Sequence, residues 1–119
     1  MLVRVLAVVL GMTPQVVFAH ARLVKSQPAA EALLSKPPAR ITLWFSEPPE
    51  NNFSTIDLSD AKKKPIALSP LTAAADQGLT VQITQTLTPG TYRVRYRVLS
   101  QDGHVIKASF KFTVNPEAR

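Results

Sequence analysis

Residues 91–99 carry the pattern that most restricts the fold of this chain. The sequence TYRVRYRVL alternates apolar and basic side chains. The apolar positions are Tyr92, Val94, Tyr96 and Val98, and the basic positions are Arg93, Arg95 and Arg97. Successive side chains of a β-strand point to opposite faces, so the pattern predicts a strand with one buried and one solvated face. The arginines are interpreted as the solvated face, which discourages edge pairing, and docking of an acidic partner is the alternative.

Shorter runs with the same period of two occur along the rest of the chain. They predict strands at residues 40–46, 53–59, 79–84 and 109–114, with brief extended pieces at 20–25 and 65–68. Residues 69–78 are predicted to form a loop, and residues 31–35 one helical turn. About seven short strands separated by turns, with no strong helix, indicate an all-β antiparallel sandwich. A β-barrel is the alternative.

Length and composition exclude several classes of protein. A chain of 119 residues holds one domain at most, and a hydrophobic content of 45% is typical of a globular protein. The absence of cysteine excludes disulfides, thiolate nucleophiles and thiolate metal sites. The formal charge of +6 comes from scattered basic residues without a nucleic-acid-binding motif, so no nucleic acid partner is expected.

Residues 1–19 are predicted to be a cleavable secretory signal peptide. Arg4 precedes an apolar run at residues 5–12, and Pro14 interrupts that run. Val17 and Ala19 are small residues at the minus-three and minus-one positions of a cleavage site. The apolar run is short for a membrane span, although a retained anchor is the alternative. The predicted mature domain comprises residues 20–119.

Cleavage after Ala19 makes His20 the N-terminal residue. An α-amine has an ordinary pKa of about 7.7–8.0 and an imidazole one of about 6.5, so both lose their protons near neutral pH. The two nitrogens then close a chelate ring on one metal ion. An amide nitrogen is a poor ligand, so processing itself would create this site.

A second candidate position lies in the loop at residues 100–104. Asp102 and His104 are two residues apart, so in extended backbone their side chains converge on one point, and Gly103 permits a tight conformation between them. Asp-Gly alone is weak evidence, because it is a common hairpin turn. Combined with His20, the set contains an amine, two imidazoles and a carboxylate. This set favours Cu(II), with Zn(II) as the alternative.

Three segments of the predicted mature chain together resemble a known family. They are His20-Ala21 followed by Leu23, Ser26 and Pro28; residues 41–48, which end in Phe-Ser-Glu-Pro; and residues 90–110, which include Ser100, Asp102, Gly103 and His104. This combination is similar to the CopC family of periplasmic copper-binding proteins. The resemblance implies a small Greek-key immunoglobulin-like β-sandwich in the periplasm that binds one Cu(II) per chain.

By this resemblance, copper is held by the amine and imidazole of His20, the imidazole of His104 and the carboxylate of Asp102. Glu47 matches an acidic position that lies close to the copper in the family. There it would orient a ligand through a hydrogen bond, and an ordinary loop carboxylate is the alternative. The resemblance also implies a CopD-type inner-membrane copper transporter as partner. The chain itself is expected to be a monomer.

The predicted function is copper buffering, transport or resistance, without enzyme activity. The only methionines, Met1 and Met12, lie in the predicted signal peptide, so a thioether-rich Cu(I) site is not expected. One alternative is a histidine-brace copper oxygenase resembling lytic polysaccharide monooxygenases, although Asp102 as a further ligand would block part of the open copper position. The other is a structural immunoglobulin-like module in which the two histidines are incidental.

Overall fold

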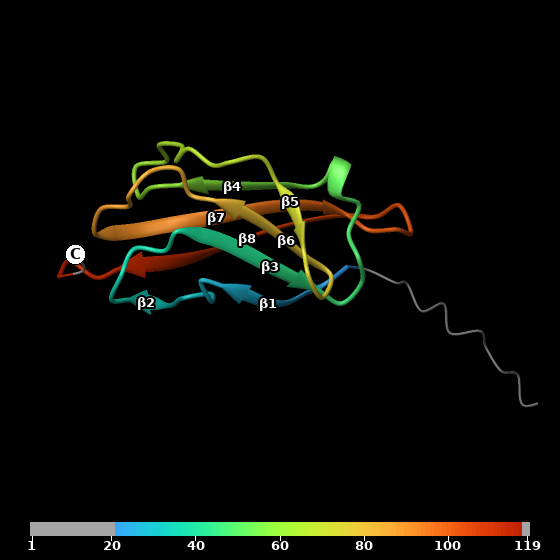
Figure 1. Ribbon diagram of the computed structural model, residues 1–119, viewed down its shortest axis with the longest axis horizontal. Coiled ribbons are helices and arrows are strands. Elements are labelled where there is room, and N and C mark those ends of the chain that lie inside the picture. Colours follow the sequence, from blue (N-terminus) through green and yellow to red (C-terminus); the bar gives the residue numbers. More distant parts are fainter. Residues whose placement is uncertain (1–20, 118–119) are drawn as a thin grey trace, which may run out of the picture.

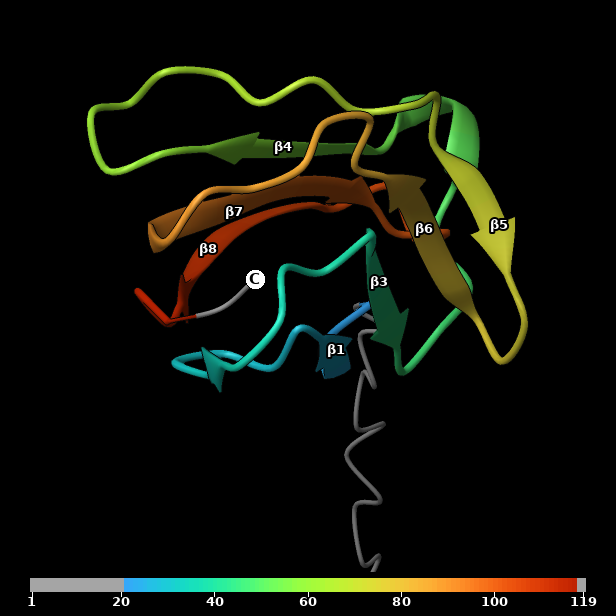
Figure 2. The same cartoon turned by 60° about the vertical axis from the view of Figure 1, so that its left-hand side comes forward.

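The computed structural model describes residues 21–117, which form two four-stranded sheets packed face to face (Figures 1 and 2). The first sheet contains, in spatial order, β1 (Leu23–Gln27), β3 (Arg40–Phe45), β6 (Gly78–Gln82) and β5 (Thr72–Ala74). The second contains β2 (Leu33–Leu34), β8 (Val105–Val114), β7 (Gly90–Leu99) and β4 (Thr55–Ser59). The chain crosses between the sheets after β1, β2, β3, β4 and β6, so spatial neighbours are often distant in sequence. The predicted all-β sandwich is confirmed, with eight strands instead of about seven.

The core lies between the two sheets and is built from alternate residues of each strand. Its large apolar members include Ile41, Leu43, Phe45, Leu79 and Val81 from the first sheet, and Ile56, Leu58, Val94, Val98, Phe110, Phe112 and Val114 from the second. Phe45 and Tyr96 meet edge to face across the sandwich, with ring centroids 5.9 Å apart. Tyr92 is also buried, and its hydroxyl donates to the carbonyl of Thr88 over 2.6 Å. Both tyrosines therefore pack in the core, as their parity predicts.

Several strand assignments predicted from the sequence were wrong. In these places pairing with another strand decides the structure, and the local residue pattern does not. The predicted helical turn at 31–35 contains the two-residue strand β2, which forms because it pairs in parallel with the end of β8. The predicted loop at 69–78 contains β5, joined to β6 by a tight turn in which Asp76 and Gln77 have positive φ angles. Residues 65–68 form only isolated bridges.

The strand predicted from Phe53 begins at Thr55 instead. Phe53 ends a single 3-10 turn, η1 (Asn51–Phe53), which explains why its parity differs from that of the strand residues that follow. No helix within residues 21–117 has the length and apolar character needed to cross a bilayer.

Residues 46–50 connect the start of the described chain to the end of β7. The amide of Ser46 donates to the carbonyl of Arg22 over 2.8 Å, and its hydroxyl accepts from the amide of Arg22 over 3.0 Å. At the other end of this segment, the amide of Glu50 donates to the carbonyl of Leu99 over 2.9 Å. Ala21 is fully buried. These bonds hold the beginning of the described chain at the end of the sandwich where β7 turns into β8 (Figure 1).

Candidate metal centre

The loop at residues 100–104 is supported by the longest hairpin of the protein. β7 and β8 pair in continuous register from Gly90↔Val114 to Leu99↔Val105. Two backbone bonds close the loop: the amide of Ser100 donates to the carbonyl of His104 over 2.8 Å, and the amide of Gly103 donates to the carbonyl of Ser100 over 3.0 Å. Gly103 has a φ of 88°, a conformation that favours glycine. The Asp-Gly sequence therefore forms part of the hairpin turn, and its backbone conformation sets the spacing between the two predicted ligands.

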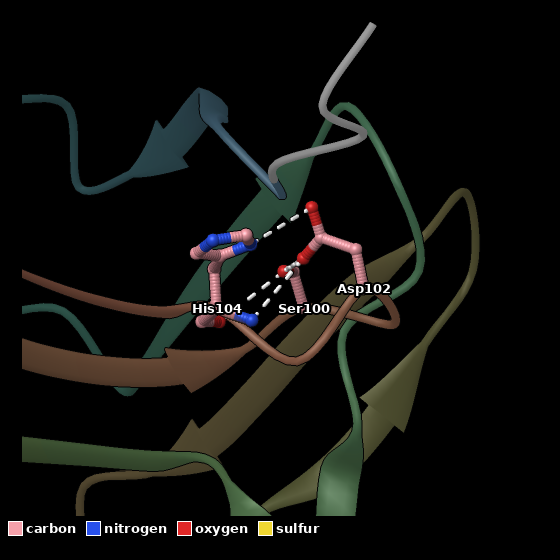
Figure 3. A network of polar contacts seen from close by, with 3 residues as sticks. All are labelled: Ser100, Asp102 and His104. Carbon is pink, nitrogen blue, oxygen red and sulfur yellow. Dashed lines mark hydrogen bonds and ion pairs between the residues drawn. The ribbon is translucent and has the colours of Figure 1, made fainter. Parts of the chain in front are cut away.

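Three side chains of this loop form one polar network (Figure 3). The hydroxyl of Ser100 donates to Oδ1 of Asp102, and the amide of His104 donates to the same oxygen over 3.2 Å. The second carboxylate oxygen, Oδ2, lies 3.1 Å from Nδ1 of His104. Ser100 is only 1% exposed, whereas the side chains of Asp102 and His104 are 23% and 52% exposed. A buried serine thus positions a carboxylate and an imidazole at the surface.

These contacts favour the ionised form of the carboxylate. The hydrogen bond from Ser100 lowers the pKa of Asp102 from 3.8 to about 2, with smaller contributions from the amide and imidazole of His104. Removal of the carboxylate from solvent opposes this effect without cancelling it. Asp102 is therefore a negatively charged oxygen donor at any pH above about 3, which is the form that binds a metal ion.

The separation of the two donor atoms fits the coordination of one metal ion. With metal–ligand bonds of about 2.0–2.2 Å, neighbouring ligands lie about 3 Å apart in a square arrangement and about 3.4 Å apart in a tetrahedral one. The observed 3.1 Å between Oδ2 of Asp102 and Nδ1 of His104 lies within this range. The spacing of the pair is therefore compatible with coordination of Cu(II) or Zn(II).

The other predicted site residues have different outcomes. His20 lies outside the described residues. Glu47 is partly buried in the segment that bonds Arg22, but within residues 21–117 it forms no hydrogen bond or ion pair with Asp102 or His104, so its orienting role stays a prediction. Within that range, no three side chains of histidine, cysteine, aspartate or glutamate lie close enough together to hold one metal ion. Asp102 and His104 are therefore two candidate ligands, and the rest of the ligand set stays a prediction.

Ser100 is the residue that the sequence patterns did not assign to the site. A serine two residues before an aspartate in a short loop is a recognisable signal, because serine hydroxyls commonly bond neighbouring polar groups in turns. The signal is not specific, since it does not reveal whether the serine is buried. Its burial at the end of β7 makes Ser100 a positioning residue for Asp102.

Similarity to known proteins extends over nearly the whole described chain. A family model described as the CopC domain matches residues 23–115. Protein YobA of Escherichia coli strain K12 is 38% identical over 104 residues, covering 86% of this chain and 83% of that protein. Copper resistance protein C of Xanthomonas campestris pv. juglandis is 36% identical over 104 residues, covering 82% and 81%.

Comparison with solved structures also finds a copper resistance protein. The crystal structure of PcoC, a methionine-rich copper resistance protein from Escherichia coli, superimposes with a TM-score of 0.74 at 33% identity, covering 82% of this chain and all of that one. The family model thus spans the strands of both sheets and the loop that holds Asp102 and His104. On this agreement of sequence and fold, the chain belongs to the CopC family of copper resistance proteins.

Proposed function

We propose that this protein binds one Cu(II) ion in the periplasm, for copper buffering, transport or resistance. The ligands are the amine and imidazole of His20, the carboxylate of Asp102 and the imidazole of His104. The observation that carries the proposal is the pair formed by Asp102 and His104 at the end of the β7–β8 hairpin, with donor atoms 3.1 Å apart. The ionised carboxylate contributes charge as well as a ligand atom.

The course of the described chain supports the assignment of His20 as the third residue of the site. Ala21 is buried, and Arg22 is bonded to Ser46 in the segment that also reaches Leu99, directly before the loop at 100–104. The described chain therefore begins at the same end of the sandwich as the loop at 100–104. Removal of residues 1–19 would release the amine that completes the nitrogen ligands.

The donor set favours oxidised copper. Imidazole, amine and carboxylate suit Cu(II), whereas Cu(I) prefers thiolates and thioethers. The chain has no cysteine, and its two methionines are Met1 and Met12, within the predicted signal peptide. The solved relative PcoC is described as methionine-rich. We therefore propose a protein restricted to Cu(II), which acts as a monomer and exchanges copper with a CopD-type membrane transporter.

Calorimetric titration with Cu(II), combined with electron paramagnetic resonance, tests this function on protein whose mass shows that it begins at His20. One tight site per chain with a nitrogen-rich spectrum is expected. His104→Ala should abolish the tight site, and one extra residue before His20 should do the same. Zn(II) should bind more weakly, following the general order of affinities.

A matched pair of variants isolates the carboxylate. Asp102→Asn removes the charged ligand, whereas Asp60→Asn alters another turn aspartate, whose Oδ1 accepts from the amides of Lys62 and Lys64 over 2.9 Å each. Only Asp102→Asn should weaken copper binding. Weak, non-stoichiometric binding by the correctly processed protein would contradict the proposed function.

A further inference from the structure

The outward side of β4, β7 and β8 concentrates positive charge on one face of the protein. These three strands lie side by side in the second sheet (Figure 1). The residues that alternate with the core along each strand point away from the core. The charged residues at these outward positions are Arg93, Arg95, Arg97, Lys107, Lys111 and Asp57, here called the basic face. Five cations and one carboxylate leave a net charge of +4, compared with +6 for the whole chain.

The strand register places like charges opposite each other. Arg93 is the register partner of Lys111, and Arg97 is the register partner of Lys107. Like charges directly opposite on antiparallel strands destabilise a sheet. Within residues 21–117, no ion pair joins any of the five cations to a carboxylate, and the guanidinium of Arg93 donates instead to the hydroxyl of Ser109 over 3.0 Å. Arg95, in contrast, has the carboxylate of Asp57 as its register partner in β4. The face as a whole keeps a net positive charge that an external anion can neutralise.

Exposed apolar side chains border this face at the end nearest the loop at 100–104. Val105, the first residue of β8, is 44% exposed and is the register partner of Leu99. Phe53 is 61% exposed, and its carbonyl accepts from Nη1 of Arg97 over 3.5 Å. An aromatic and an aliphatic residue beside a row of cations is the composition of surfaces that bind the interfacial region of membranes.

We propose that the basic face docks on an anionic phospholipid surface. Its cations lie about 5 Å apart across β7 and β8, about 7 Å apart along β7 and about 14 Å apart along β8, a spread that suits a plane of many phosphates better than one anion. Arginine binds phosphate with two parallel hydrogen bonds, and Phe53 and Val105 enter the interface beside it. Docking in this orientation brings the loop at 100–104 towards the membrane. The inference goes beyond the proposed copper site and does not depend on it.

Co-sedimentation with lipid vesicles tests the proposal on metal-free protein that has been exported and whose mass shows the loss of residues 1–19. The protein should sediment with vesicles of equal parts phosphatidylglycerol and phosphatidylcholine, but not with phosphatidylcholine alone. Binding should fall with added salt, because salt screens exposed charges.

Two double variants with the same change of net charge locate the surface. Each basic residue near an anionic membrane strengthens binding about fivefold, so Arg95→Gln combined with Lys107→Gln should weaken binding about 25-fold. Lys25→Gln combined with Arg40→Gln removes two exposed cations from the first sheet and should change binding little. Near-ultraviolet circular dichroism confirms that each variant is folded.

Three results would overturn the proposal. Equal binding to both kinds of vesicle would show that anionic lipid is not recognised. Equal weakening by the two double variants would show that the net charge matters but the basic face does not. Binding to polyglutamate without binding to anionic vesicles would identify the face as a docking surface for an acidic protein. None of these results depends on whether the protein binds copper.

Discussion

The variant Ser100→Ala tests whether Asp102 and His104 are positioned as metal ligands or merely happen to be in contact. The substitution removes the hydroxyl that donates to Oδ1 of Asp102, which is the largest cause of its lowered pKa. The pKa of Asp102 should therefore rise from about 2 towards 3.8. Since the carboxylate would lose the bond that orients it, Cu(II) affinity at pH 7 should fall by about 10- to 100-fold, which is typical for loss of a residue that positions a ligand.

Two measurements follow the substitution. Carbon-13 NMR titration of the metal-free protein reports the pKa of Asp102 directly, and competition with a coloured chelator at pH 7 reports the copper affinity. Thermal unfolding at two pH values tests the direction of the effect of Asp102 on stability. A carboxyl whose pKa is lower in the folded state stabilises the fold above its ordinary pKa of 3.8, and this contribution is lost as the pH falls through about 2. The difference in Tm between wild type and Ser100→Ala should thus be smaller at pH 2 than at pH 7.

Ser54→Ala is the matched control. Ser54 is also buried, and its hydroxyl donates to the carbonyl of Glu50 over 2.7 Å and accepts from the amide of Leu99 over 3.4 Å, but it contacts no carboxylate. This variant should lose stability and keep both the pKa of Asp102 and the copper affinity. The reasoning is refuted if Ser100→Ala leaves the pKa and affinity unchanged, or if the two serine variants lose affinity equally.

Three further predictions concern the site and the core. Asp102 stays ionised to about pH 2, so copper release between pH 7 and pH 4 should follow protonation of the nitrogen ligands. A pH titration of the copper-loaded protein measures this release. A protein that retains its copper at pH 4 would contradict the proposed ligands. Position 103 has space for the methyl group of Gly103→Ala, but its φ of 88° disfavours alanine. This variant should lower the free energy of unfolding, measured by urea denaturation, by about 1 kcal/mol. An unchanged free energy would show that the loop relaxes. Leu43→Ala empties a fully buried position and should cost about 2–5 kcal/mol by the same assay, with copper affinity unchanged while the protein remains folded.

Local patterns were sufficient for the parts of the fold in which each strand has one buried face. The alternation at residues 91–99 predicts β7 and the burial of Tyr92 and Tyr96, and the structure confirms both. The loop at 100–104 and the adjacency of Asp102 and His104 also follow from the chain alone, because two residues separated by one glycine are close in any fold. The membership of the CopC family rests on similarity over residues 23–115 and on the fold.

Contacts between distant segments decided the rest. β2 and β5 have no strand pattern of their own and form because β8 and β6 offer them a paired edge. The first four residues of β8 lie outside the predicted strand at 109–114 and are set by their register with β7. That register also places Lys107 and Lys111 beside the arginines of β7. The basic face therefore extends over two strands, whereas the sequence pattern showed basic residues on one.

The sequence by itself determined an all-β chain and a carboxylate and an imidazole that share one loop. Both depend on neighbours along the chain, whose side-chain directions follow from backbone geometry. Only the tertiary structure decided that Ser100 is buried beneath Asp102 and lowers its pKa, and that Arg22 and Leu99 contact one segment at the same end of the sandwich. The burial of a loop residue such as Ser100, and contacts between segments distant in sequence, depend on the packing of the two sheets, which the alternation within one strand does not encode.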